Sequence, residues 1–212
     1  MRRLNFIALA LLSPLFISRA YPQVSKEKKM NAENQISALI PNGYTLKNTR
    51  AVPVDGEEMV LSRYERSDGV NGGLMGENFS MILNKSGLLK GFVSYQEGTS
   101  DANQLPGKDR SEKIARDFLR VYAPDLLQYM EVHWVKPHDE IIKVKQQGGK
   151  TKTIKITGMK VKCRNVKDGR WFWVIVSSKE KPFVFERDIV WINFPGMRKT
   201  EKWLHDSWLA NK

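Results

Sequence analysis

Apolar residues are most concentrated in two runs near the C-terminus. In the first run, residues 171–176, large apolar side chains occupy both alternating sets of positions, which predicts a central strand covered on both faces of a sheet. The second run, residues 183–191, is also apolar but contains Glu186, Arg187 and Asp188. A short polar turn separates the two runs, so we expect them to form a hairpin.

The three charges in the second run have a structural explanation. Alternation along a regular strand places Glu186 and Asp188 on one face. The other face then carries Phe183, Phe185, Arg187, Ile189 and Trp191. We expect this run to lie at an exposed sheet edge, where charges deter pairing with other molecules and opposite charges on neighbouring strands attract each other. The expected basic partners of the two carboxylates are Lys160, Lys162 and Arg164.

The clearest helix signal covers residues 109–122. Its apolar face consists of Ile114, Phe118, Val121 and Tyr122, which recur at helical spacing. Asp109, with Glu112 three residues later, predicts a capping box at the start of the helix. Because Pro124 disfavours helical geometry at the residue before it, we expect the helix to end there.

Weaker signals predict the remaining elements. Residues 31–40 predict a short helix, and a Pro-Asn-Gly turn follows them. Residues 79–83 and 88–95 predict a hairpin whose turn ends at Gly87, where a positive φ is often needed. Other predicted strands cover residues 57–64, 130–135, 140–145 and 153–164.

The first residues have the pattern of a secretory signal peptide. Arg2 and Arg3 precede an apolar run over residues 4–17, and small residues follow it. Because the run is shorter than the roughly 20 residues that a membrane span needs, we expect cleavage after Ala20 and a periplasmic or secreted protein without a transmembrane segment. Cleavage would lower the formal net charge from +12 to +9, since residues 1–20 contain three arginines and no acid.

The composition predicts a packed core. A single cysteine, Cys163, excludes an internal disulfide, and alternation directs its side chain toward the core and away from its basic neighbours. The chain also contains six Trp, nine Phe and six Tyr, which argues against a disordered basic protein. Stability should therefore come mainly from apolar burial.

A basic stretch offers a candidate surface for anionic ligands. Residues 141–167 contain nine basic residues and no acidic one. Alternation places the basic residues of each strand on one face, beside Trp171 and Trp173 of the next strand, where they would meet lipid headgroups, polysaccharide or nucleic acid. No nucleic-acid motif accompanies them, so nucleic acid is not the expected partner. The candidate residues for polyanion binding are Lys143, Lys145, Lys160, Lys162 and Arg164.

No pattern in the chain predicts catalysis. The sequence contains neither HExxH nor GxSxG, and its glycine-rich loop lacks the Lys and Ser/Thr of a phosphate-binding loop. The histidines, His133, His138 and His205, lack the spacing of metal ligands, so we expect structural or solvent-facing roles for them. We therefore expect no enzymatic activity, metal or cofactor, and an enzyme that uses these histidines is the alternative hypothesis.

The order helix, strand, strand, hairpin occurs twice, over residues 31–95 and again from Asp109 to about residue 194. In the first copy, "RYERSDGVNGGLMGENFSMILNKSGLLKGFVSY" resembles the hairpin of PepSY-type domains, with its Asn/Asp-x-x-Gly turn. In the second, "SEKIARDFLRVYAPDLL" resembles the opening helix of the PepSY unit and "DGRWFWVIVSSKEKPFVFERDIVW" its hairpin, although this turn lacks Gly. The resemblance implies an α+β fold of two similar units, each a helix packed on an antiparallel sheet.

The resemblance also implies a division of the chain and a function. The predicted parts are a signal peptide (1–20), a flexible leader (21–30), a first unit (31–96), a linker (97–108) and a second unit with an aromatic C-terminal helix (109–212). PepSY-type units occur in propeptides of secreted metallopeptidases and in stand-alone exported proteins, and are thought to inhibit or assist proteases. This implies a non-catalytic role with a protein partner outside the cytoplasm. The candidate protein-binding residues are Phe183, Phe185, Glu186, Arg187, Asp188, Trp191, Trp203 and Trp208.

Overall fold

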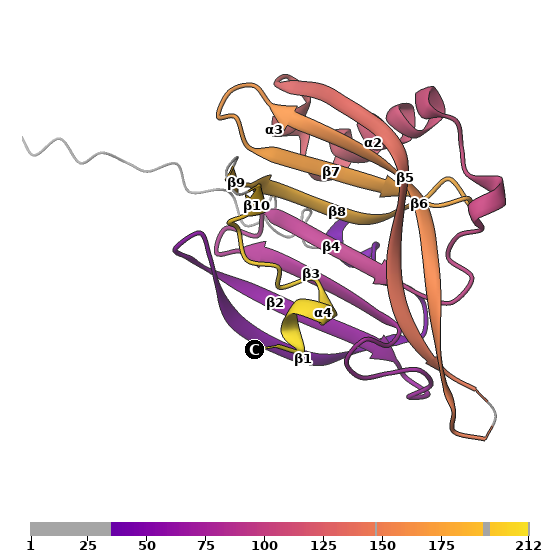
Figure 1. The fold of residues 1–212 in the computed structure, drawn as a ribbon. Helices are drawn as coiled ribbons and strands as arrows, with labels where there is room; N and C mark the ends of the chain where they lie inside the picture. Colours follow the sequence, from indigo (N-terminus) through magenta and orange to yellow (C-terminus); the bar gives the residue numbers. More distant parts are fainter. Residues whose placement is uncertain (1–34, 147, 193–195, 212) are drawn as a thin grey trace, which may run out of the picture.

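The computed structural model describes residues 35–146, 148–192 and 196–211. Eight strands form one antiparallel sheet in the order β1-β2-β3-β4-β8-β7-β6-β5 (Figure 1). The first four are β1 Tyr44–Val54, β2 Glu57–Arg66, β3 Asn78–Asn84 and β4 Leu89–Tyr95. The other four are β5 Met130–Lys145, β6 Thr151–Asn165, β7 Trp171–Val176 and β8 Pro182–Ile189. Two short strands, β9 Trp191–Ile192 and β10 Met197–Arg198, pair with each other.

The sheet consists of two four-stranded meanders that meet at β4 and β8. Consecutive strands are neighbours within each meander, and β4 pairs antiparallel with β8, with Gly91 opposite Glu186 and Val93 opposite Val184. The pairing covers two apolar strands that would otherwise be exposed edges. The prediction of two α+β units, each a helix on its own antiparallel sheet, is therefore wrong, because the chain forms one mostly β structure around a continuous sheet.

Strand β8 lies in the interior of the sheet. It pairs with β4 on one side and with β7 on the other, and Phe183 and Phe185 are both buried. The predicted exposed edge over residues 183–191 is therefore wrong. The outer strands are β1 and β5, and the loop over residues 67–77 covers part of β5, where the backbone N–H of Lys143 donates to the carbonyl of Met75 at 2.7 Å.

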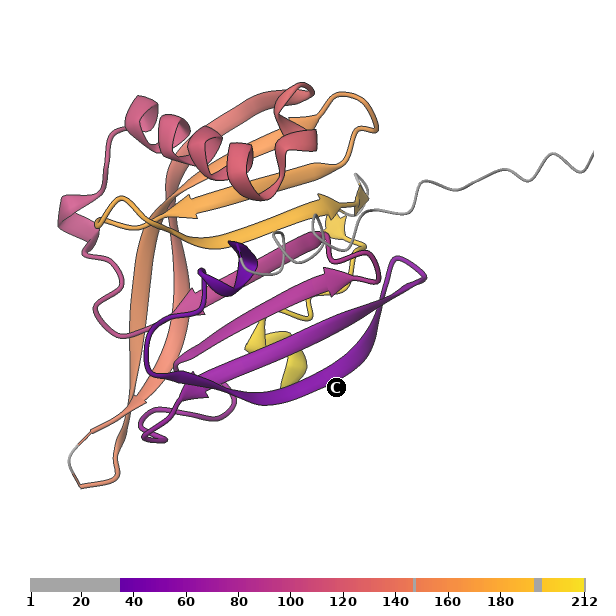
Figure 2. The same cartoon turned by 180° about the vertical axis from the view of Figure 1, so that it is seen from behind.

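Two helices, α2 Lys108–Tyr122 and α3 Pro124–Leu127, cover one face of the sheet, which we name the α2 face (Figure 2). The ring of Phe118 in α2 lies 5.7 Å from that of Phe92 in β4 and 5.3 Å from that of Phe185 in β8, measured between centroids. The helix therefore seals the junction between the two meanders. Its buried apolar residues are Ile114, Ala115, Phe118 and Leu119.

The ends of the helices agree only partly with the predictions. Helix α2 begins after Gly107, so Asp109 lies inside the first turn, and the predicted capping box is wrong. Val121, predicted on the buried face, is 48% exposed. The helix does end before Pro124, as predicted, and this proline begins α3. Of the predicted first helix, residues 35–37 are helical, whereas the predicted signal peptide and leader lie outside the described residues.

The opposite face, which we name the α4 face, carries a second core beneath the C-terminal segment, residues 199–211. This segment includes α4 Asp206–Leu209, which lies over β1–β3 (Figure 1). Leu204 is 3% exposed and joins an apolar cluster with residues from both meanders. The long β5–β6 hairpin adds Ile142 and Ile156 to the same cluster. The segment therefore closes an apolar surface to which both halves of the sheet contribute.

The predicted central strand and the predicted first hairpin are both present. Strand β7 buries Phe172 on the α2 face and Trp173 on the α4 face. The hairpin between β3 and β4 turns at Gly87, which has a φ of +82°. Cys163 is buried, as alternation predicted. Across the described ranges, no helix combines the length and the apolar character that crossing a membrane requires.

Gly91 lies where β4, β8 and the C-terminal segment meet. A Cβ atom at this position would lie 2.7 Å from the carbonyl oxygen of Phe185 and 2.8 Å from Cδ1 of Leu204. We predict that Gly91→Ala lowers the free energy of unfolding in urea by about 1–3 kcal/mol, the usual cost of overpacking. Gly107→Ala is the control, because nothing lies within 4 Å of its Cβ position. Equal stability of the two variants would contradict the tight junction.

Candidate functional site

A lysine of β6 is surrounded by three tryptophan rings on the α4 face. The Nζ of Lys162 lies 4.3 Å from the ring centroid of Trp171, 5.6 Å from that of Trp134 and 5.4 Å from that of Trp191. These distances are within the roughly 6 Å over which an aromatic ring attracts a cation. Burial lowers the pKa of Lys162. The lysine therefore forms the centre of an aromatic surface to which β5, β7 and β9 each contribute a ring.

A β-bulge in β5 completes this arrangement. The pairing of β5 with β6 shifts between Val132 and Trp134, which makes His133 the extra residue. After the shift, Trp134 lies opposite Lys162, and the ring of His133 contacts Trp171 edge to face at 5.0 Å. The bulge therefore brings two consecutive aromatic side chains to one face, which a regular strand does not allow.

A second cation extends this surface, and the short β9–β10 hairpin beside it carries exposed apolar side chains. Trp191 is 42% exposed, and Ile192 and Met197, paired across β9 and β10, are 39% and 53% exposed. The guanidinium of Arg164 lies 5.7 Å from the ring of Trp171. The surface therefore combines two cations with the exposed ring of Trp191, and the hairpin that carries this ring has two further exposed apolar side chains. We name Trp134, Trp171, Trp191, Lys162 and Arg164 the tryptophan–cation patch.

The cations of the patch have a carboxylate nearby, because Glu131 of β5 stands directly opposite Arg164. Within the described part of the chain, neither Lys162 nor Arg164 forms an ion pair with an aspartate or glutamate. The predicted pairing of Glu186 and Asp188 with these basic residues is wrong, because Glu186 binds Arg198 and Asp188 binds Lys90. Both charges of the patch remain available to an anionic partner.

An irregularity in β8 determines the face of the sheet toward which each of the three charged side chains of this strand points. Arg187 and Asp188 together stand opposite a single residue of β7, and Asp188 has a φ of +59°. Both turn toward the α2 face, where Arg187 binds Asp125 of α3 and Asp188 binds Lys90 of β4. Glu186 stays on the α4 face. Arg187 therefore holds helix α3 against the sheet, Asp188 links β8 to its neighbouring strand β4, and Glu186 faces the opposite side.

Glu186 anchors the C-terminal segment through a buried charged cluster. Its carboxylate oxygens lie 2.7 Å from Nη2 of Arg198 and 2.9 Å from Nε2 of His205. Burial acts to raise the pKa of Glu186, but the positive charges of His205 and Arg198 outweigh it and lower this pKa. Burial acts to lower the pKa of His205, but Glu186 outweighs it and raises this pKa. Glu186 and His205 thus each favour the charged form of the other.

The five candidate polyanion residues do not share one surface. Lys162 and Arg164 belong to the patch, whereas Lys160 lies with its Nζ 4.0 Å from the ring of Trp173, and burial lowers its pKa to about 8. From Trp134 onward β5 pairs regularly with β6, so the odd-numbered residues of β5 point away from the patch. Lys143 and Lys145 are therefore exposed on the opposite face of the sheet.

The predicted C-terminal tryptophan pair braces the C-terminal segment. Nε1 of Trp203 donates a hydrogen bond to the carbonyl of Pro53 at 2.7 Å. The ring of Trp203 contacts that of Trp208 edge to face at 4.7 Å, and both residues are partly buried. The two rings therefore hold the segment against β1.

Of the residues predicted to bind a protein, only Trp191 belongs to the patch. Phe183 and Phe185 are core residues, and the three charges of β8 form internal ion pairs. Sequence reasoning missed Trp134, because a regular strand with His133 on one face would place the tryptophan on the other. The aromatic pair at residues 133–134, beside a strand with alternating cations, was the available signal.

The three histidines lie in separate environments. His133 contacts Trp171, Nε2 of His138 lies 3.4 Å from Glu140, and His205 binds Glu186. Across residues 35–146, 148–192 and 196–211, no three side chains of His, Cys, Asp or Glu converge to hold a metal ion.

Comparison with known proteins found no match to this chain among protein-family models, curated proteins or solved structures.

The contact between His205 and Glu186 predicts a pH-dependent stability. Because the folded-state pKa of His205 lies above its ordinary value of 6.5, this contact stabilises the fold fully below pH 6.5 and loses its effect as the pH rises through the folded-state value. We predict that His205→Gln lowers the free energy of unfolding by about 1–3 kcal/mol at acidic pH. The difference from wild type should shrink as the pH rises. Urea unfolding of both proteins over a pH series measures this difference in the free energy of unfolding. A difference that does not change with pH would contradict the proposed ion pair.

Proposed function

We propose that the protein is an exported, non-catalytic binding protein that attaches to anionic lipid surfaces through the tryptophan–cation patch. The observation that supports this is the position of Lys162 among three tryptophan rings, without a carboxylate partner in the described residues. Tryptophan prefers the membrane interface, and basic side chains are attracted to anionic headgroups. The patch combines both on one face.

The neighbouring apolar side chains favour lipid over other anionic partners. Ile192 and Met197 lie exposed on the hairpin that also carries Trp191. An interfacial protein buries such side chains at the boundary between headgroups and acyl chains. Nucleic-acid binding instead relies on many phosphate contacts, and the patch contains only Lys162 and Arg164 as cations.

A protein partner is the second candidate, and the exposure of Trp191 favours it. Tryptophan is enriched among the few residues that dominate the binding energy of protein interfaces. The resemblance to PepSY-type units suggests a secreted protease as such a partner. A lipid surface, however, also accounts for the two cations that flank Trp171, so it is our first proposal.

Vesicle sedimentation with residues 21–212 tests the lipid proposal. We expect binding to vesicles of phosphatidylcholine mixed with phosphatidylglycerol, and much weaker binding to phosphatidylcholine alone. Because each basic residue near an anionic membrane contributes about 1 kcal/mol, Lys162→Gln/Arg164→Gln should weaken the partition coefficient by about thirtyfold. Trp191→Ala should reduce the binding that remains at high salt, since that part depends on apolar burial.

The control variant, Lys143→Gln/Lys145→Gln, removes the same charge from the opposite face of the sheet and should bind vesicles as the wild type does. Equal losses in the two double variants would show that net charge, rather than the patch, drives binding. If vesicles do not bind at all and Trp191→Ala abolishes capture of a secreted protein, the second candidate replaces the first. Urea unfolding of each variant checks that it is folded.

A further inference from the structure

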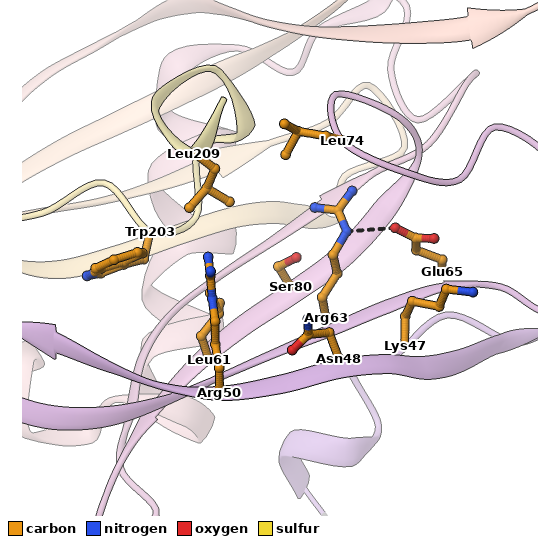
Figure 3. A pocket seen from close by; sticks show the side chains of 10 residues that line it. All are labelled: Lys47, Asn48, Arg50, Leu61, Arg63, Glu65, Leu74, Ser80, Trp203 and Leu209. Carbon is orange, nitrogen blue, oxygen red and sulfur yellow. Dashed lines mark hydrogen bonds and ion pairs between the residues drawn. The ribbon is translucent and has the colours of Figure 1, made fainter. Parts of the chain in front are cut away.

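A pocket of about 330 Å³ opens on the α4 face of the first meander, between β1–β3 and the C-terminal segment (Figure 3). Its apolar lining comes from Leu61 in β2, Leu74 in the 67–77 loop, and Trp203 and Leu209 in the C-terminal segment. Small-molecule pockets range from about 300 to 1,000 Å³, so this pocket suits a small ligand. Its polar lining consists of Lys47, Asn48, Arg50, Arg63, Glu65 and Ser80.

A β-bulge in β1 gathers polar side chains at this pocket. The pairing of β1 with β2 shifts between Leu46 and Asn48, so Lys47 is the extra residue. Lys47 and Asn48 both line the pocket, although consecutive residues of a regular strand point to opposite faces. Arg50 then lies on the same face as Asn48. The bulge therefore adds a cation that regular alternation would direct elsewhere.

The charge of Arg63 is already compensated. Its Nε lies 2.8 Å from Glu65, its Nη1 lies 2.8 Å from Asp206, and its Nη2 donates to the carbonyl of Gly73 at 2.7 Å. The side chain is mostly buried. Arg63 thus acts as a structural link between the sheet, the 67–77 loop and α4, and forms one wall of the pocket (Figure 3).

The charges of Lys47 and Arg50 are not compensated. Both side chains are exposed, and within the described ranges neither forms a hydrogen bond or an ion pair. The guanidinium of Arg50 lies 5.2 Å from the ring centroid of Trp203, at the border between the polar and apolar linings. Positive charge therefore stands directly beside the apolar wall formed by Trp203 and Leu209.

We propose that this pocket binds a small anionic amphiphile, such as a medium-chain carboxylate. The guanidinium of Arg50 binds the carboxylate, because its planar donors match the two oxygens, and Lys47 adds a second positive charge. The apolar chain lies along Trp203, Leu209 and Leu74, where it loses contact with water. This site is separate from the tryptophan–cation patch and does not depend on the proposed membrane attachment.

Isothermal titration with decanoate, kept below the concentration at which it forms micelles, tests the proposal. We expect one saturable site at neutral pH, where the carboxylate is ionised. Arg50→Gln should weaken binding by about tenfold or more, because it removes hydrogen bonds to a charged group. Decanol has the same chain length but no charge. It should bind at least about tenfold more weakly than decanoate, because it lacks the charged group that Arg50 would hydrogen-bond.

Lys143→Gln is the control, since it removes the same charge from an exposed side chain on the opposite face of the sheet, outside both proposed sites, and should leave the affinity for decanoate unchanged. Arg164→Gln distinguishes the pocket from the tryptophan–cation patch. If Arg164→Gln weakens binding and Arg50→Gln does not, decanoate binds the patch and the pocket proposal is overturned. Absence of a saturable site, or equal affinities for decanoate and decanol, would overturn it as well. Failure of vesicle binding would leave this result unaffected, so the two proposals are tested independently.

Discussion

The pairing of β4 with β8 is the contact on which the rest of the structure depends. It joins residues as far apart in sequence as Gly91 and Glu186, and it turns two meanders into one sheet. Each meander alone would leave an apolar strand at its edge. The joined sheet offers two apolar surfaces, so α2 closes one across the junction through Phe118, and the C-terminal segment closes the other through Leu204.

The charges of β8 secure this arrangement on both faces. Glu186 holds the C-terminal segment, Arg187 holds α3 and Asp188 holds β4. Charged groups this close to a core are stabilising only when each has a partner, and here the partners come from elements that must stay docked. A run that was predicted to be a protected edge strand is thus an interior strand to which β4, β7, α3 and the C-terminal segment are all bound.

The local patterns of the sequence predicted the individual strands and helices well. They predicted the arrangement of these elements in space poorly. Both apolar faces of β7, the turn at Gly87 and the end of α2 before Pro124 follow from periodicity and from the geometry of single residues. The β4–β8 contact does not, because no local pattern identifies which distant strand will pair. The resemblance to paired helix-on-sheet units followed the order of the elements, but it carried no information about the joining of the two meanders.

Bulges explain why the candidate sites were only partly predictable. An extra residue reverses which side chains reach each face. Lys47 carries no local signal of being extra, and the only signal at His133 is the aromatic residue that follows it. The sequence therefore predicted Lys162, Arg164 and Trp191 as binding residues, but not Trp134 or Arg50. Lys143 and Lys145 were grouped with Lys162 because alternation within a strand does not reveal which face meets the rest of the sheet.

The enclosure of Lys162 by three rings has a further consequence for recognition. A free lysine side chain loses up to about 2 kcal/mol of conformational entropy when it is fixed, and in most binding sites this loss occurs during association. Here the rings of Trp134, Trp171 and Trp191 already restrict the side chain within the folded protein. The patch is therefore preorganised, and its central charge meets a partner without further ordering of the lysine.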